Sequence, residues 1–222
     1  MTFQEQNINR VDTNIIIDNQ YFANINCINA LFKSTHINIF SFEAYRKMSF
    51  RNRCVVAGSN GLINLSVPVQ SGRDQKSVFK DVRISYTDGW QKQQWVTLIS
   101  CYNKSAFFEF YRDGLEKFFQ KKEVFLFDLD LAVLHWLQKV LGFKAEIKVW
   151  ESGPEIEELA QMTDLRDRWL PKNFQRPELQ NFTSRYFQVF ENRLGFQPNL
   201  SVLDLLFNEG PNAATLLINS IM

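Results

Sequence analysis

Four cations gather in the segment YRKMSFRNRCVV at residues 45–56, in a chain whose formal net charge is only +1. If residues 47–56 are extended, alternation places Lys47, Arg51 and Arg53 on one face and Asn52 on the other. Arg51 and Arg53 are then about 7 Å apart, and two planar guanidinium groups at that spacing suit the oxygens of a phosphate or diphosphate. The alternative is a solvated face whose cations keep an edge strand from pairing. Asn52 favours a site, because an amide on an apolar face needs a partner if it is buried.

A second group of polar and aromatic side chains recurs at helical spacing after residue 88. Trp90 and Gln94 share one face of the expected helix, and Trp95 and Tyr102 share another. An aromatic stripe on a helix can belong either to a packed core or to the wall of a ligand site. Gln94 is polar and therefore fits a packed core less well than its aromatic neighbours do. Further along, Asp128 and Asp130 begin another expected helix, where carboxylates are favoured by the helix dipole.

These side chains need elements to position them, and the first half of the chain predicts strands around one helix. A buried run followed by a turn (residues 14–22) precedes an amphipathic helix (residues 25–34) with apolar residues at spacings of three and four. Asn60-Gly61 is a strong turn signal, so residues 52–69 are expected to form a hairpin. The expected strands are residues 36–42, 62–69 and 79–85.

The second half predicts helices, followed by a polar connection. Three helices are expected within residues 88–105, 106–122 and 128–143, the first capped by Asp88 and the last ended by Gly142. A strand follows at residues 144–150. This order favours an α/β fold with a mostly buried mixed sheet flanked by helices and a helical C-terminal tail, with α+β as the alternative.

The chain is expected to be one domain with a short tail at its N-terminus. Residues 1–13 are polar and are expected to be disordered. Residues 14–222 form the domain, in which residues 151–181 are a long connection. Residues 182–222 are expected to be a helical tail that packs back on the domain. Two short helices are expected within residues 182–211, where Ser201 and Asp204 resemble a capping box.

Composition restricts the cellular setting and the chemistry. Cys27, Cys54 and Cys101 are odd in number and form no CxxC pair, so reduced thiols, a cytoplasmic location and no metal site are expected. The first residues contain no signal peptide, no apolar run is long enough to insert into a membrane, and a net charge of +1 argues against nucleic acid as a partner. No GxGxxG, P-loop, GxSxG or HExxH motif is present, so no cofactor is expected.

Several stretches together resemble the WbqC-like protein family, in the form common in Bacteroidetes. They are QYF, YRKMSFRNRCVVAGSNGLINLSVPV, KDVRISYTDGWQKQQW, CYNKSAFFEFY and LSVLDLLFNEGP, and they cover about residues 15–210. The resemblance implies work on an activated sugar or a related precursor of surface polysaccharide. By position, the family motifs fall on Tyr21, Phe22, Lys47, Arg51, Asn52, Arg53, Trp90, Gln94, Trp95, Tyr102, Ser105, Phe107 and Phe108. The chain departs from the family at Ala23 and Ala106, where proline is usual, and at Gln94, where histidine is usual.

Two hypotheses of different classes follow from the resemblance and the residues. In the first, the protein is a group transferase acting on a phosphorylated or nucleotide-linked precursor. Arg51 and Arg53 bind phosphate, Asn52 and Gln94 orient the acceptor, and Trp90 or Tyr21 stacks on a ring. In the second, the protein binds such a ligand, a small phosphorylated compound or nucleotide sugar, without chemistry. An amide does not titrate, so Gln94 favours the second hypothesis. The resemblance to a biosynthetic family over most of the chain favours the first, which we adopt as the prediction.

Overall fold

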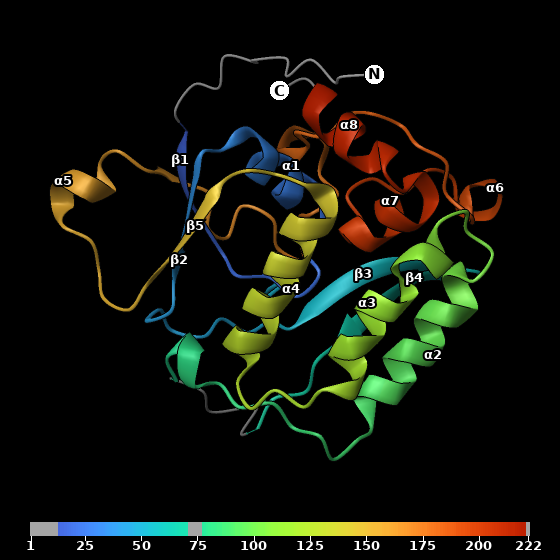
Figure 1. The fold of residues 1–222 in the computed structure, drawn as a ribbon, viewed down its shortest axis with the longest axis horizontal. Helices are drawn as coiled ribbons and strands as arrows, with labels where there is room; N and C mark the ends of the chain where they lie inside the picture. The colour runs from blue at the N-terminus through green and yellow to red at the C-terminus, as the bar shows by residue number, and fades with distance from the viewer. Residues whose placement is uncertain (1–12, 71–76, 221–222) are drawn as a thin grey trace.

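A four-stranded parallel sheet and a separate two-stranded hairpin form the β-structure of the protein (Figure 1). The structure, a computed structural model, describes residues 13–70 and 77–220. The sheet order is β5-β2-β1-β6, and every neighbouring pair is parallel. The α/β class expected from the sequence is confirmed. The predicted disordered segment 1–13 lies, except for Thr13, outside the described residues. The strands are β1 (Asn14–Ile17), β2 (His36–Phe40), β5 (Glu146–Trp150) and β6 (Thr163–Asp164).

The first crossover of the sheet is the β1-α1-β2 unit, and α1 (Ile25–Lys33) is the helix expected from apolar spacing. Asn24 caps it by accepting a hydrogen bond from the backbone N–H of Cys27 at 3.0 Å. The three isoleucines of β1 are buried, as expected for an inner strand of a parallel sheet covered on both faces.

The hairpin predicted at residues 52–69 is confirmed as β3 (Arg53–Gly58) and β4 (Gly61–Ser66), with Arg53 opposite Ser66. The prediction that residues 47–56 are all extended is wrong, because a turn precedes Arg53 and Met48 has a φ of 55°. The side chain of Arg51 is held by Asp18 from the loop after β1 and by Glu43 from its own β2–β3 connection, and these bonds fix the turn. Arg51 and Arg53 therefore do not share one strand face.

Two other local predictions are wrong. Residues 79–85 do not form a strand: they contain a 3-10 turn (Phe79–Asp81), and Arg83 and Ile84 make only isolated bridges to Phe125 and Val69. No strand runs beside this segment for long enough to extend the pairing. Gly89, at a φ of 61°, takes the N-cap position that was expected for Asp88.

The helices of the second half cover the sheet and the hairpin (Figure 1). The three long helices and the left-handed Gly142 at a φ of 76° confirm the sequence pattern. Residues 151–181 contain one short helix, the short strand β6 and a 3-10 turn. The two short helices expected within residues 182–211 are present, and one further helix follows them. The helices are α2 (Trp90–Tyr102), α3 (Phe108–Gln120), α4 (Leu126–Leu141), α5 (Ile156–Leu159), α6 (Glu191–Leu194), α7 (Val202–Glu209) and α8 (Asn212–Asn219).

The C-terminal helices α7 and α8 pack against α1, and buried asparagines of α1 bind the chain that returns to it. Asn26 Oδ1 accepts hydrogen bonds from the backbone N–H groups of Asn181 and Phe182, each at 2.7 Å. Asn29 donates to the carbonyl oxygen of Leu217 at 2.6 Å. Ser201 caps α7 through the N–H of Leu203. These contacts place α7 and α8 in the same core as α1.

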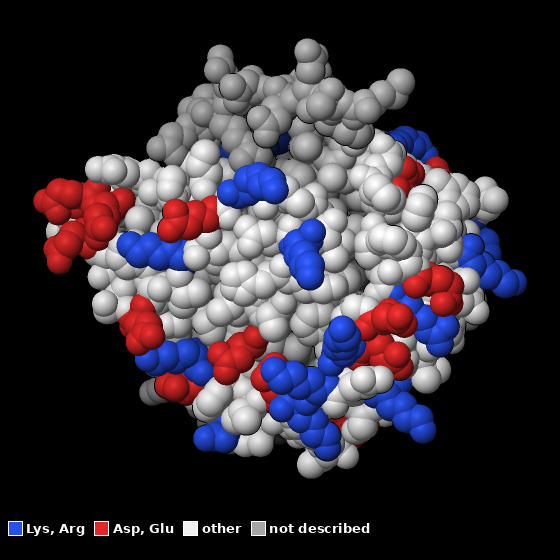
Figure 2. All heavy atoms as spheres, viewed as in Figure 1, with Lys and Arg blue, Asp and Glu red and all other residues white. Residues whose placement is uncertain are grey.

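Charged side chains of both signs are scattered over the face seen in Figure 2, with an acidic group over the short helix α5. None of the helices in residues 13–70 and 77–220 is long and apolar enough to cross a bilayer. Over the same residues, no three histidine, cysteine, aspartate or glutamate side chains gather in a way that could hold a metal ion.

Candidate functional site

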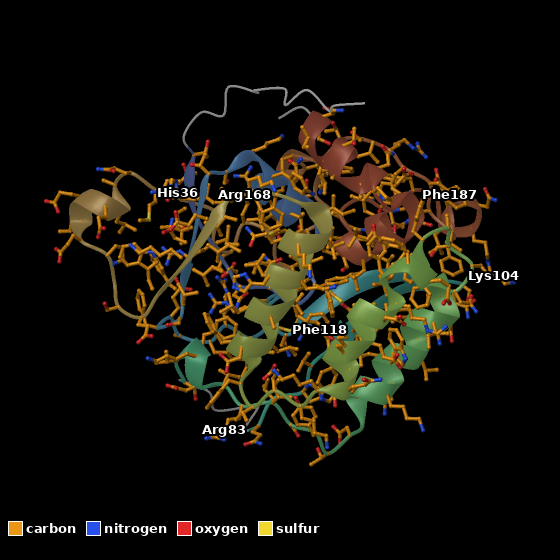
Figure 3. All side chains as sticks on the ribbon, in the orientation of Figure 1. His36, Arg83, Lys104, Phe118, Arg168 and Phe187 are labelled. Atoms are coloured by element: carbon orange, nitrogen blue, oxygen red, sulfur yellow. The ribbon has the colours of Figure 1, made fainter. Side chains whose placement is uncertain are left out.

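Charged side chains meet where the parallel strands β1, β2 and β6 end. Asp18 directly follows β1, Glu43 lies three residues after β2, and Arg166 lies two residues after β6. In parallel α/β sheets, ligands bind outside the carboxyl ends of the strands, where the loops that follow them converge. Figure 3 shows the side chains that fill the space between the sheet and α4.

Arg51 is the centre of this group. Asp18 Oδ1 accepts from Arg51 Nε at 3.3 Å and from Nη2 at 2.8 Å, and Glu43 Oε2 accepts from Nη2 at 2.7 Å. Nη1 donates to the carbonyl oxygen of Ala44 at 3.1 Å, and the guanidinium lies 4.9 Å from the centroid of the Phe79 ring. Burial lowers the pKa of Arg51, but the two carboxylates more than offset this and raise it above its ordinary value. Arg51 is 3% exposed, and its side-chain nitrogens already donate hydrogen bonds within the protein.

Further contacts hold Asp18 and Glu43, the two carboxylates that bind Arg51. Arg166 contacts Glu43 through Nη1 and donates from Nε to Asp164 at 2.9 Å. Arg46 pairs with Asp167, whose backbone N–H donates to Asp18 Oδ2 at 2.7 Å. The loops after β1, β2 and β6 are thus joined by alternating charges. Within this network four carboxylates face three guanidinium groups, so no positive charge is left to bind a further anion.

Asp130, on the inner face of α4, is the exception to this pairing. It is 0% exposed, and neither carboxyl oxygen has a hydrogen-bond partner among the described residues. Burial raises the pKa of Asp130 well above its ordinary value, and the nearby charge of Arg51 offsets only part of that rise. Its charge also acts on the hydroxyls of Tyr21 and Tyr45. The helix-dipole interpretation suits Asp128, which is exposed in the first turn, but not Asp130.

Other buried polar atoms in the same region also have no partner among the residues described. Asn19 donates to the carbonyl oxygen of Phe127 at 3.0 Å, one turn before Asp130, but its Oδ1 is unpaired. Asn52 donates to the carbonyl oxygen of Val67 at 3.0 Å, and its Oδ1 is also unpaired. Arg53 Nε is unpaired, while the rest of this half-buried side chain reaches solvent. Most buried polar groups in proteins are satisfied, so Asn19, Asn52, Arg53 and Asp130 stand out as residues whose polar atoms are left open to a partner outside the described chain.

Two of the predicted site residues contact each other beside this group. Tyr21 Oη donates to Gln94 Oε1 at 2.9 Å, and Gln94 Nε2 donates to the carbonyl oxygen of Ser66 at 2.8 Å. Ser66 is the strand partner of Arg53. The structure therefore brings Tyr21, Asn52, Arg53 and Gln94 into one neighbourhood. Both ends of the Gln94 amide are used within the protein.

The remaining predicted residues lie elsewhere. Trp90 donates to the carbonyl oxygen of Ser85 at 3.0 Å, and Trp95 stacks on Phe119 with 5.5 Å between ring centroids. The two tryptophans line a separate surface hollow of about 400 Å³. Lys47 is exposed in the turn before β3.

Tyr102 belongs to a buried network around Asp204 of α7. Its hydroxyl donates to Asp204 Oδ2 at 2.7 Å and accepts from the N–H of Ala57 at 3.1 Å. Tyr186 donates to Asp204 Oδ1 at 2.7 Å, and Gln188 donates to the same atom at 3.3 Å. Burial raises the pKa of Asp204 to about 6, although these three donors favour its charged form. The carboxyl that was expected in a capping box instead ties α7 to α2 and β3.

Sequence reasoning missed Asp18, Glu43 and Arg166 and misread Asp130. One signal was available: Asp18 follows the buried run NIII without an intervening residue. A charged residue at the carboxyl end of a parallel strand is positioned for a site. No comparable signal marks Arg166, which lies in the long connection 151–181.

Comparison with known proteins returned one match. The model of the WbqC-like protein family matches residues 20–170. This range contains Tyr21, Arg51, Arg53, Gln94 and Asp130, together with most of the sheet. Searches of curated proteins and of solved structures each returned no match.

Proposed function

The chain belongs to the WbqC-like protein family, and we propose that it is a group transferase that acts on a phosphorylated or nucleotide-linked sugar precursor of surface polysaccharide, O-antigen type. The observation that carries this proposal is a set of buried polar atoms without a partner among the described residues: the carboxyl of Asp130, the Nε of Arg53 and the amide oxygens of Asn19 and Asn52. Hydroxyl groups of a sugar can donate to the amide oxygens, and a phosphate can accept from the guanidinium.

Arg53 is the phosphate contact in this proposal, and Arg51 is a positioning residue. Arg51 is enclosed by Asp18 and Glu43 and has no free donor edge. Arg53 makes no ion pair with any residue in the described ranges, and its half-buried position leaves the guanidinium within reach of a ligand. A charge-assisted bond in a partly enclosed site is stronger than one at an open surface.

Asp130 serves as a protonated carboxyl that donates to an oxygen of the bound precursor. Because burial raises its pKa, the neutral form persists to higher pH than for an ordinary aspartate. As the bond from the transferred group to the leaving oxygen breaks, Asp130 gives that oxygen its proton, and Arg53 meets the charge on the phosphate. The acceptor hydroxyl forms the new bond to the transferred group and releases its proton, which restores the neutral form of Asp130. Binding and turnover should therefore fall as pH rises through the pKa of Asp130.

The test is a binding titration with a panel of nucleotide sugars and sugar phosphates, followed by a transfer assay with the compounds that bind. Arg53→Lys should weaken binding about ten- to a hundredfold, because an ammonium cannot reproduce a planar two-donor contact. Arg112→Lys is the matched control, since Arg112 lies on the outer surface of α3 and pairs only with Glu109. Equal affinity of the Arg53 variant and the wild type for every compound bound would contradict the proposed site.

A non-catalytic binding protein of the same pathway is the second candidate. It is favoured by Gln94, which replaces the usual family histidine and is held between Tyr21 and Ser66. The transfer assay separates the candidates. A protein that binds a sugar precursor through Arg53 and shows no transfer over a range of acceptors and pH is the binding protein. Transfer that is lost in Asp130→Asn identifies the transferase.

A further inference from the structure

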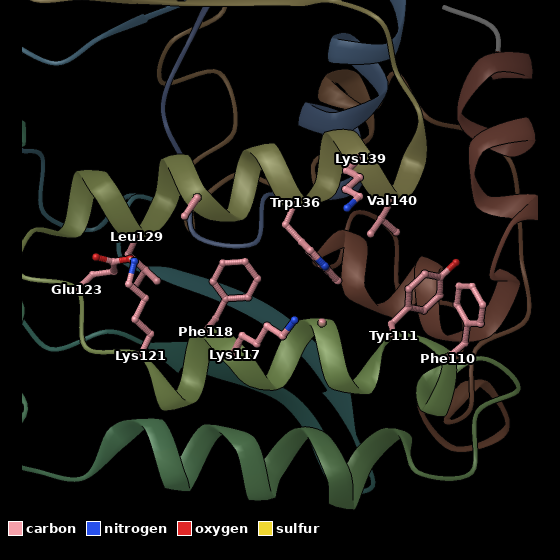
Figure 4. Close-up of a pocket in the computed structure, with 12 residues that line it drawn as sticks. Phe110, Tyr111, Lys117, Phe118, Lys121, Glu123, Leu129, Trp136, Lys139 and Val140 are labelled. Carbon is pink, nitrogen blue, oxygen red and sulfur yellow. The ribbon is translucent and has the colours of Figure 1, made fainter.

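A second hollow lies between helices α3 and α4, on a different face of α4 from Asp130 (Figure 4). Its volume is about 670 Å³, within the usual range for pockets that hold small molecules. Its apolar lining includes Phe118 from α3 and Leu129, Trp136 and Val140 from α4. Phe110, 75% exposed, extends that surface at one end.

The hollow depends on a glycine within a helix. Gly114 lies in the middle of α3, where glycine weakens a helix. A Cβ at this position would lie 2.9 Å from Trp136 Nε1, so only glycine lets the indole lie across α3. The indole N–H has no hydrogen-bond acceptor among the residues described. It is a donor placed at the edge of an apolar surface, available to a bound molecule.

The rim of the hollow carries more positive than negative charge. Lys117, Lys121 and Lys139 line it with Glu123 as the one carboxylate among the lining residues described. Lys121 Nζ lies 2.5 Å from Glu123 Oε1, so this pair neutralises itself. Lys117 and Lys139 make no ion pair with any described residue. Figure 4 shows them on opposite helices, with Trp136 beside Lys139 and Phe118 beside Lys117.

We propose that this groove is a second binding site, and that its ligand is an amphiphilic anion, an apolar chain bearing one phosphate or carboxylate. The apolar chain lies along Phe118, Leu129 and Val140. The anionic head lies at the rim, where Lys117 and Lys139 supply charge and the Trp136 indole supplies a hydrogen bond. A groove that served only to pack the two helices would not need uncompensated lysines on both sides, and a cationic or neutral chain would leave them unpaired.

The experiment titrates the full chain with decyl phosphate at concentrations below the critical micelle concentration of the probe. Tryptophan fluorescence and calorimetry measure the binding. Decanol and decyltrimethylammonium are the neutral and cationic comparison probes. Decyl phosphate should bind at least tenfold more tightly than decanol, and the cationic probe should bind least. Equal binding of decyl phosphate and decanol would overturn the anionic part of the proposal.

Three variants locate the site. Lys117→Gln/Lys139→Gln should lower the affinity for decyl phosphate at least tenfold and leave decanol unchanged. Lys104→Gln/Lys144→Gln, which removes two exposed lysines outside the groove, should change neither. Ala132→Trp fills the groove and should abolish binding of both probes. If it does not fold, the lysine pair alone decides the location.

A vesicle assay distinguishes a free amphiphile from a lipid in a bilayer. The groove is a site for monomers, so the protein should bind decyl phosphate in solution and should not sediment with phosphatidic acid vesicles. Sedimentation with the vesicles and no binding of the monomer would contradict the proposal. Binding that is unaffected in both the lysine variant and the groove-filling variant would also contradict it.

Discussion

Replacing Asp130 by asparagine should make the protein more stable at neutral and alkaline pH. Asp130 is fully buried, and neither carboxyl oxygen has a partner in the described part of the chain. The substitution keeps the shape of the side chain and removes its charge. A residue kept for the fold would lower stability when replaced, so the sign of the change separates a structural role from a functional one.

The magnitude follows from the unpaired carboxyl and its pKa. Asparagine also leaves buried polar atoms unpaired at this position, so the gain comes from removing the charge, whose burial costs more than that of a neutral group. We expect Asp130→Asn to raise the free energy of unfolding by about 1–3 kcal/mol at pH 8. For a chain of this size, this corresponds to about 2–12 °C in Tm. The folded-state pKa lies above the ordinary value of 3.8, so the unfolded chain releases this proton first as pH rises. The contribution of Asp130 to the free energy of unfolding therefore falls above about pH 4. The stability difference between the variant and the wild type should grow from pH 4 to pH 8.

Thermal and urea unfolding at pH 4, 6 and 8 measure this difference. Asp128→Asn is the matched control, because it makes the same substitution at an exposed position of the same helix. Burial and the nearby charge of Glu123 raise the pKa of Asp128 as well. The control should therefore change stability in the same direction as Asp130→Asn but by much less, because Asp128 is exposed to solvent. A lower Tm for Asp130→Asn at pH 8 would refute the reasoning, since it would show that the carboxylate stabilises the fold.

Further predictions concern the rest of the structure. The pKa of Asp204 is about 6 in the folded state against 3.8 for an ordinary aspartate, so its deprotonation should lower the free energy of unfolding by roughly 3 kcal/mol as pH rises from below 4 through 6. Asp204→Asn should make the free energy of unfolding, measured by urea titration, depend less on pH. An unchanged pH dependence in this variant would contradict the assignment. Tyr102→Phe leaves Asp204 Oδ2 and the backbone N–H of Ala57 without their buried partner, so it should lower the free energy of unfolding by about 1–3 kcal/mol. A loss of less than 0.5 kcal/mol in the same titration would contradict this. A chain ending at residue 170, where the family match ends, should show no cooperative thermal transition, because α1 loses its partners in α7 and α8; a sharp transition would argue against this. The thiols of Cys27 and Cys54 are buried and their pKa values are raised by burial, so a thiol reagent should label them only after unfolding, and labelling of the native protein within seconds would contradict this.

The elements that the sequence predicted are those whose signals are local. The hairpin followed from Asn60-Gly61, and α4 ended at Gly142 as expected, because each turn is fixed by its own residues. Residues 79–85 alternate like a strand, but pairing needs a neighbour that the fold does not supply. Local sequence patterns therefore predicted most of the helices and strands. They failed where strand pairing depends on residues far away in the sequence.

The candidate site was less predictable because its contacts join distant parts of the chain. Arg51 lies 33 residues from Asp18, and Glu43 lies 123 residues from Arg166. A cluster of cations in the sequence could not show that Arg51 is neutralised in this way. Asp130 was misread because position near a helix start does not say which face is buried.

The packing of α1 against the end of the chain has a consequence for synthesis on the ribosome. Asn29 finds its partner 188 residues later, and at roughly 5–20 residues per second that interval lasts about 10–40 s. During this time the apolar face of α1, with Ile25, Ile28 and Leu31, cannot be covered by α7 and α8. The nascent chain therefore displays a helix that a holding chaperone can bind until α7 and α8 have been synthesised.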